Sequence, residues 1–197
     1  MAEEEFLVPL DQYLKAGLHI GTKYKTKYME PFIYKVRPDG LSILNIQEIN
    51  RRVKMLALFL ARYNPEEILV IGRRENSWKA LKSFSQVTGI KAFSERYSPG
   101  VLLNTALEDF MEIKFLLVVD PFPDKNVIDD ALKLGIPVVA LCDTNNTANE
   151  LDLVVPCNNK GKKSLGLIFY ILAREYLKLR KLGDLKLKPE DFGTEDD

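Results

Sequence analysis

Two stretches of this chain combine basic side chains with groups that suit nucleic acid. In the first, residues 19–37, the lysines of 23–28 alternate with tyrosines and a threonine without a helical or strand-like apolar period. Lysine and arginine attract phosphates, and aromatic rings stack on unpaired bases, so this stretch predicts contact with RNA. A solvated loop whose tyrosines pack on the core is the alternative. The residues concerned are His19, Lys23, Lys25, Lys27, Tyr28, Lys35 and Arg37.

The second stretch is a polar turn at residues 158–163. It comes just before a long apolar segment that predicts a helix over 164–182. The free N–H groups at a helix start attract anions, and lysines there add positive charge. We therefore predict phosphate contact at this turn too, with simple helix capping as the alternative. Its residues are Asn158, Lys160, Lys162 and Lys163.

The charges of the chain are unevenly distributed, although they cancel in total. The formal net charge is zero, yet residues 15–82 carry 14 bases against 6 acids and residues 160–181 carry 7 against 1. Two basic segments can attract a polyanion even when the whole molecule is neutral. Hydrophobic residues make up 46% and charged residues 28%, which is ordinary for a globular domain.

The predicted strand ends lack the motifs of nucleotide chemistry. After the apolar run 68–71 comes Gly72, followed by Arg73 and Arg74, where a dinucleotide fold needs G-x-G-x-x-G. The two arginines still suit a phosphate, whether it belongs to a ligand or to RNA. The turn at 156–163 likewise departs from a P-loop. A nucleotide-binding α/β enzyme that uses Arg73, Asp120 and Asp143 remains the alternative reading.

Metal sites and catalytic triads are not predicted either. Asp120, Asp124 and Asp143 follow strands, but they lack D-x-D spacing and are typical of turns or caps. His19 is the single histidine, no G-x-S-x-G motif is present, and a zinc site would need more ligands. We expect no catalytic residue, no metal, no cofactor and no small-molecule substrate.

The cysteines and the N-terminus indicate a cytoplasmic protein. Cys142 and Cys157 end apolar strands, which predicts buried structural thiols in a reducing compartment. No apolar run approaches the roughly 20 residues that a membrane helix needs. Residues 1–5 are acidic where a signal peptide would be basic and then apolar. We expect no membrane partner.

These candidate residues depend on a regular alternation of strands and helices. Apolar runs predict strands at 68–71, 91–93, 115–119, 138–141 and 153–155, and amphipathic segments predict helices at 47–63, 77–88, 126–134 and 164–182. The alternation predicts a Rossmann-like or flavodoxin-like three-layer α/β sandwich with a mainly parallel five-stranded sheet. A short helix at 9–16 and a hairpin from strands 32–36 and 41–46 would extend it at the N-terminus.

Three parts follow from this pattern. Residues 1–46 form an N-terminal extension that begins with an acidic arm at 1–8, expected to be frayed. Residues 47–182 form the α/β core. Within the core, a loop at 95–104 leads into a short amphipathic piece that ends at Phe110. Residues 183–197 form an acidic C-terminal tail, expected to be loosely docked or disordered.

Several separated motifs resemble one family, the universal small-ribosomal-subunit protein S two, whose eukaryotic branch includes the laminin receptor precursor. They are LKAGLHIGT (14–22), FSERYSPGVLLN (93–104), FLLVVDP (115–121), IPVVALCDTNNT (136–147) and DLVVPCNNKGKKSLGLIFYILAREYL (152–177). The chain lacks the long helical insertion of bacterial members, and Thr22 stands where they usually have a second histidine. The resemblance is therefore to the archaeal type.

The resemblance implies a Rossmann-like core without nucleotide chemistry, placed at the head–body junction of the small ribosomal subunit. It implies contacts with small-subunit ribosomal RNA and adjacent ribosomal proteins, and a role in subunit assembly and translation. It supplies no catalytic residues. It does not say which side chains touch RNA, so the RNA-binding candidates rest on local chemistry alone. An adhesion role is not expected.

Overall fold

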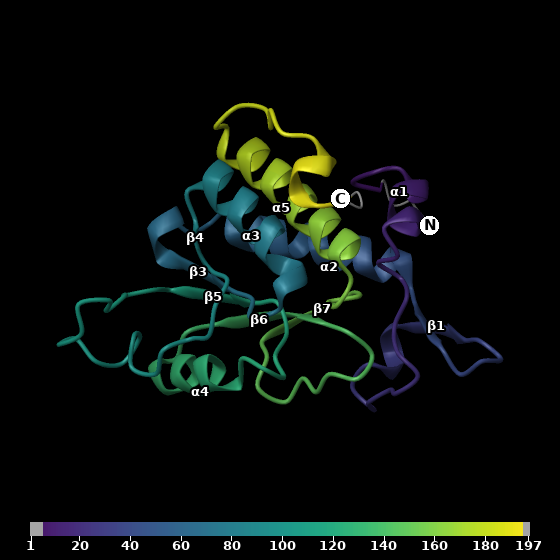
Figure 1. The fold of residues 1–197 in the computed structure, drawn as a ribbon, viewed down its shortest axis with the longest axis horizontal. Coiled ribbons are helices and arrows are strands. Elements are labelled where there is room, and N and C mark those ends of the chain that lie inside the picture. The colour runs from purple at the N-terminus through teal and green to yellow at the C-terminus, as the bar shows by residue number, and fades with distance from the viewer. Residues whose placement is uncertain (1–5, 195–197) are drawn as a thin grey trace.

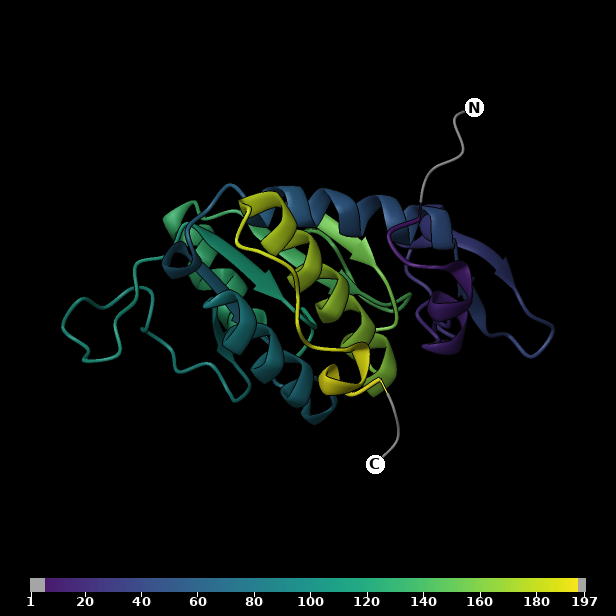
Figure 2. The same ribbon diagram turned by 90° about the horizontal axis from the view of Figure 1, so that it is seen from above.

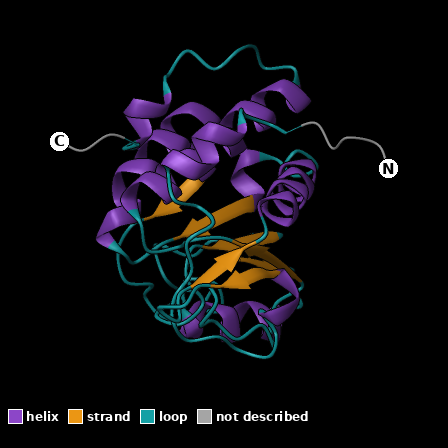
Figure 3. Ribbon diagram, turned by 90° about the vertical axis from the view of Figure 1, so that its right-hand side faces the viewer, coloured by secondary structure: helices purple, strands orange, loops and turns teal. Residues whose placement is uncertain are grey.

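The protein is a parallel sheet between two layers of helices (Figures 1 and 3). The computed structural model describes residues 6–194. The sheet has the order β4-β3-β5-β6-β7, and each neighbouring pair of strands is parallel. Its strands are β3 (Ile68–Ile71), β4 (Lys91–Phe93), β5 (Phe115–Val118), β6 (Val138–Cys142) and β7 (Leu153–Pro156). The predicted α/β fold with five parallel strands is confirmed.

The four core helices divide unequally between the faces of the sheet. Helices α2 (Ile46–Leu60), α3 (Glu75–Thr88) and α5 (Lys162–Arg180) cover one face, and α4 (Lys125–Leu134) lies on the other (Figure 1). Strands β3, β5, β6 and β7 are buried along their whole length, which explains their continuous apolar runs. Helix α5 is buried nearly all round because it lies against both α2 and α3.

Helix ends differ from the predictions by up to three residues. Helix α2 ends at Leu60, because the bonds from Arg62 N to Phe59 O and from Tyr63 N to Leu60 O close tight turns instead of continuing the helix. Helix α5 begins at Lys162, with Gly161 at its N-cap and Leu165 N donating to Gly161 O over 3.0 Å. Two of the three turn lysines therefore lie inside the first turn of α5.

The α4 face is completed by a long loop instead of a second helix. Residues 94–114 contain no helix or strand, so the short amphipathic piece predicted before Phe110 is a series of turns. Its apolar residues act as separate anchors, with Tyr97, Val101 and Leu102 buried in the core. The Tyr97 hydroxyl donates to Asp130 Oδ2 over 3.0 Å and fixes the loop to α4. Figure 2 shows this loop and the N-terminal extension at opposite ends of the molecule.

The N-terminal extension packs beside the β7 edge of the sheet (Figure 1). It contains α1 (Leu10–Lys15), the short η1 helix (Glu30–Phe32) and an antiparallel hairpin of β1 (Ile33–Val36) and β2 (Ser42–Leu44), as predicted. The acidic arm does not fray over residues 6–8, because Val8 is buried and Leu7 N donates to Asn50 Oδ1 over 3.0 Å. Residues 1–5 of that predicted arm lie outside the described residues.

The C-terminal tail packs against the core as far as Gly193. This corrects the expectation of a loose segment. The short η3 helix (Pro189–Phe192) inserts Phe192, which is 1% exposed, edge-to-face against Tyr170 with ring centroids 5.8 Å apart. A Cβ on Gly166 would lie 2.7 Å from the Phe192 carbonyl oxygen, so only glycine admits this approach. Ser83 Oγ donates to Asp191 O over 2.9 Å and ties the same segment to α3.

We expect Gly166→Ala to destabilise the fold by roughly 1–3 kcal/mol, because the new methyl group overlaps backbone of the docked tail. Urea unfolding measures this change. In a chain that ends before Pro189 the same substitution should be neutral or stabilising by up to about 1 kcal/mol, since alanine is the better helix former. An equal cost in both chains would show that the tail is not the cause.

Candidate nucleic-acid interface

The basic loop at residues 22–30 is fixed to the loop after β6 by a set of hydrogen bonds centred on Thr144. Thr22 N donates to Thr144 Oγ1 over 2.9 Å, and Thr144 Oγ1 donates to Tyr24 O over 2.9 Å. Thr26 N donates to Thr144 O over 2.9 Å. Thr26 Oγ1 adds a 2.7 Å bond to Asn146 O. The basic loop therefore has a defined backbone path along the carboxyl edge of the sheet.

The segment before the loop is equally constrained. A Cβ on Gly21 would lie 2.4 Å from Thr144 Cγ2 and 3.0 Å from Ser42 O, so the chain can pass here only as glycine. The His19 carbonyl accepts a 2.8 Å bond from Leu44 N, and burial lowers the pKa of the His19 imidazole below its ordinary value of 6.5. Near neutral pH this ring is uncharged, so His19 adds no positive charge to the interface.

The lysines and tyrosines of the basic loop point into solvent. Lys23, Lys25 and Lys27 are exposed, and Tyr24 and Tyr28 are 81% and 55% exposed. Among the described residues neither Lys23 nor Lys27 has an ion-pair partner, whereas Lys25 lies 3.1 Å from Glu30 in a pair exposed at both ends. Such a pair contributes at most about 1 kcal/mol and yields easily to a phosphate.

The hairpin carries the last two candidates of this stretch. Lys35 and Arg37 are exposed on β1 and in the turn that follows it. Arg37 pairs with Asp39 over 3.3 Å, again on the surface. The hairpin that carries them lies at the far end of the N-terminal extension in Figure 2.

The side chains of the turn at 158–163 make more internal contacts than those of the basic loop. Asn158 Oδ1 accepts from Lys160 N (3.1 Å) and Gly161 N (3.0 Å), and Asn158 Nδ2 donates to Gly17 O over 3.3 Å. Lys160 Nζ lies 3.0 Å from Asp143 Oδ2 and 2.8 Å from Asn145 Oδ1. Asp143 is 1% exposed, so Lys160 neutralises a buried carboxylate. Lys162 and Lys163 are half-buried in the first turn of α5.

The strand order of the sheet reverses between β3 and β5. A flavodoxin-like enzyme binds its ligand at this topological switch point. Here Arg74 forms a forked ion pair with Asp120, with Nε and Oδ2 2.6 Å apart. Asp120 Oδ1 also accepts from Asn146 Nδ2 over 3.0 Å. Of the residues proposed for a nucleotide enzyme, Asp120 and Asp143 are therefore buried in internal contacts, while Arg73 is exposed.

Asparagine side chains join the Arg74–Asp120 ion pair to the loops after β6 and β7. Asn146 Oδ1 accepts from Asp143 N (2.7 Å) and from Asn159 Nδ2 (3.0 Å). Asn159 Nδ2 also donates to Leu141 O over 2.9 Å. Sequence reasoning assigned no role to Asn146 or Asn159. Their only signal was an asparagine-rich composition, which says nothing about their partners.

The described residues show neither a reactive thiol nor a metal site. Cys142 and Cys157 are fully buried, and burial raises the pKa of both thiols, so they are protonated structural residues as predicted. The described side chains bring together no group of three or more histidine, cysteine or carboxylate residues placed to hold a metal ion. None of the helices between residues 6 and 194 has the length and apolar content to span a membrane.

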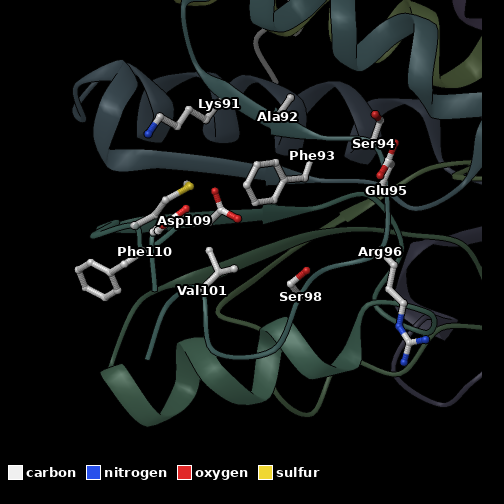
Figure 4. Close-up of a pocket in the computed structure, with 12 residues that line it drawn as sticks. Lys91, Ala92, Phe93, Ser94, Glu95, Arg96, Ser98, Val101, Asp109 and Phe110 are labelled. Carbon is white, nitrogen blue, oxygen red and sulfur yellow. The ribbon is translucent and has the colours of Figure 1, made fainter. Parts of the chain in front are cut away.

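A hollow of about 560 Å³ lies beside β4, between that edge strand and the 94–114 loop (Figure 4). Lys91 and Arg96 stand at opposite ends of it in Figure 4. The carboxylates of Glu95, Glu108 and Asp109 also line the hollow. Because acids outnumber bases, this hollow is a poorer phosphate site than the basic loop.

We expect Arg74→Ala to destabilise the protein by up to roughly 3–5 kcal/mol, because it leaves the Asp120 carboxylate buried without its cation. Arg74 is 37% exposed, so water recovers part of that cost. Arg73→Ala is the matched control and should change the free energy of unfolding by less than about 0.5 kcal/mol. Chemical denaturation of both variants gives the comparison. Equal costs would contradict the structural role of Arg74.

Asp124 gives a pH-dependent prediction. Burial raises the pKa of its carboxyl from 3.8 to about 6, so the folded state binds this proton more tightly than the unfolded chain does. The resulting penalty is absent below about pH 4 and complete above about pH 6. Asp124→Asn should therefore gain stability over the parent by up to about 3 kcal/mol at pH 7 and little at pH 4. A gain that is independent of pH would contradict this assignment.

Comparison with known proteins identifies the family. The description "Ribosomal protein S2" belongs to the family profile that matches residues 13–112 and 107–178. Small ribosomal subunit protein uS2 of Nanoarchaeum equitans is 48% identical over 192 residues, covering 95% of this chain and 96% of the relative. The protein of the same name from Picrophilus torridus is 46% identical over 197 residues, covering 100% and 98%.

The relative from Methanoregula boonei, also named small ribosomal subunit protein uS2, is 46% identical over 192 residues and covers 98% of this chain and 94% of its own length. All three relatives are archaeal and are named as ribosomal proteins instead of enzymes. The alternative of a nucleotide-binding enzyme is therefore set aside. With the profile and these relatives spanning nearly the whole chain, the protein belongs to the ribosomal protein S2 family.

Proposed function

We propose that this protein is a structural component of the small ribosomal subunit that binds ribosomal RNA through its basic loop. The observation that carries the proposal is the geometry of residues 22–30. The backbone of residues 22–26 is bonded to Thr144, and Met29 N and Glu30 N bond back to Thr26 O. The lysines and tyrosines of the loop face solvent. A loop that is already ordered loses little conformational entropy on binding, so more of the phosphate attraction becomes affinity.

The family supports the remainder of the proposal. As a member, the protein would sit at the head–body junction, contact neighbouring ribosomal proteins and be needed for subunit assembly and translation in the cytoplasm. The predicted RNA-binding residues differ in how available they are. Lys23, Lys25, Lys27 and Tyr28 are exposed, and Lys35, Arg37 and Arg73 extend the surface.

The other candidates would contribute less. Arg74 and Lys160 already compensate buried carboxylates, the Asn158 amide caps its own turn, and the His19 ring lacks charge. Lys162 and Lys163, at the start of α5, remain candidates for phosphate contact because a helix start favours anions.

The experiment is to replace Lys23 and Lys27 together by glutamate and to measure binding to small-subunit ribosomal RNA over about 50–200 mM salt. Each lost phosphate contact should reduce the slope of log affinity against log salt by roughly 0.7–0.9. The double variant should therefore bind more weakly, with a slope shallower by about one to two.

A matched control is available in Lys91 and Lys186, which are exposed and lie outside the proposed interface. Replacing both by glutamate makes the same change in net charge. The control should keep the parental slope. If both double variants lose affinity equally, the effect is one of net charge and the proposed site is wrong.

A further inference from the structure

Phe122 presents an aromatic ring to solvent in a way that its surroundings do not explain. It is 86% exposed, the largest exposed fraction among the large apolar side chains that the structure describes. It lies in the loop between β5 and α4, at the carboxyl edge of the sheet. An exposed phenylalanine here costs solvation and stabilises nothing in the isolated protein. Single exposed apolar side chains are common on protein surfaces, so the case for a partner rests on what surrounds Phe122.

The loop that carries Phe122 is constrained. Pro121 and Pro123 flank the residue and limit its backbone. Phe122 N donates to Asp120 Oδ1 over 3.1 Å, and Asp120 is itself held by Arg74. The ring therefore projects from a fixed tip, which lowers the entropy that a partner would have to remove.

Beside the ring is a hollow of about 370 Å³ whose lining suits a nucleobase. Ile128 and Leu151 give it apolar surface, and Asn145, Thr147 and Asn149 bring hydrogen-bonding groups to it. Among the described residues the Thr147 and Asn149 side chains have no hydrogen-bond partner. Amide and hydroxyl groups of this kind read the edges of unpaired bases.

The charges at the hollow fit one nucleotide. Lys125 lines it, is exposed and has no ion-pair partner among the described residues, so it is available to a phosphate. Glu150 also lines the hollow and can accept hydrogen bonds from the amino or imino groups of a base. The hydrogen-bonding groups and the two opposite charges at the hollow favour a nucleotide over a protein side chain as its occupant.

The hollow is continuous with the proposed RNA surface through one loop. Residues 143–147 hold the basic loop through Thr144 and line the hollow through Asn145 and Thr147. An RNA strand bound along the basic loop would thus have the hollow close to its path.

We propose that Phe122 and this hollow bind a single unpaired RNA nucleotide, with the base stacked on Phe122 and its phosphate near Lys125. The proposal rests on the proposed function, because it names a further RNA contact of the same protein. It adds recognition of a base to a surface that otherwise binds the backbone.

The first test titrates the full chain with short single-stranded RNAs that carry a fluorescent adenine analogue. Phe122→Ala should weaken binding by roughly 5- to 150-fold and abolish the stacking-dependent quenching, as expected for the loss of one stacked base. Phe122→Tyr should keep both. Leu182→Ala removes another exposed apolar side chain, beyond the end of α5, and should change neither.

The two proposals fail in different ways. If Phe122→Ala binds these RNAs as the parent does while the Lys23 and Lys27 double variant binds weakly, the nucleotide site is wrong and the basic loop stands. If Phe122→Ala weakens binding and the lysine variant does not, the basic loop is wrong and the nucleotide site stands.

The second test uses assembled small subunits. In subunits that contain the Phe122→Ala variant, one unpaired nucleotide should gain reactivity toward a base-modifying reagent, and Phe122→Tyr should restore its protection. Unchanged RNA reactivity, with or without loss of a neighbouring protein, would overturn the proposal.

Discussion

The contact between Thr144 and the basic loop is the interaction on which the position of the proposed interface depends. It joins residues 22–26 of the extension to the loop after β6, over about 120 positions of sequence. Each hydrogen bond contributes only about 0.5–1.5 kcal/mol, but several act on one short segment. Because Gly21 and Thr144 are in van der Waals contact, the extension cannot shift without opening this junction. The backbone positions that carry the lysines are thereby fixed relative to the sheet.

A buried polar network connects the strand ends next to the junction between the basic loop and Thr144. Arg74, Asp120, Asn146 and Asn159 connect the ends of β3, β5, β6 and β7, so the edge where α/β enzymes bind ligands is filled with internal contacts. Low dielectric makes each broken bond in such a network costly, so the network resists opening, although Asn159 Oδ1 is buried without a hydrogen-bond partner. The edge that binds nucleotides in enzymes of this fold here fixes the positions of the surface loops. The proposed RNA-binding residues lie on the outer side of those loops.

Much of the fold could be predicted because its signals are local. Continuous apolar runs such as 138–141 and helix-ending glycines such as Gly135 report their own conformation. The site was less accessible, since its determinants are pairings between distant residues. No local pattern pairs Lys160 with Asp143, although the turn that carries this lysine was correctly placed just before a helix. Likewise, no local pattern indicates that Gly166 leaves room for the backbone at Phe192. The tail was therefore wrongly expected to be loose. Phe122 drew no prediction, because nothing in its local sequence says whether its ring is buried or exposed.

A structure of the small subunit that contains this chain tests most directly whether the basic loop binds RNA. We expect ribosomal RNA phosphates within contact of Lys23 and Lys27, and residues 22–26 still bonded to Thr144 as in the free protein. A subunit in which that loop faces solvent or a neighbouring protein, or in which it leaves Thr144 to reach the RNA, would contradict the account.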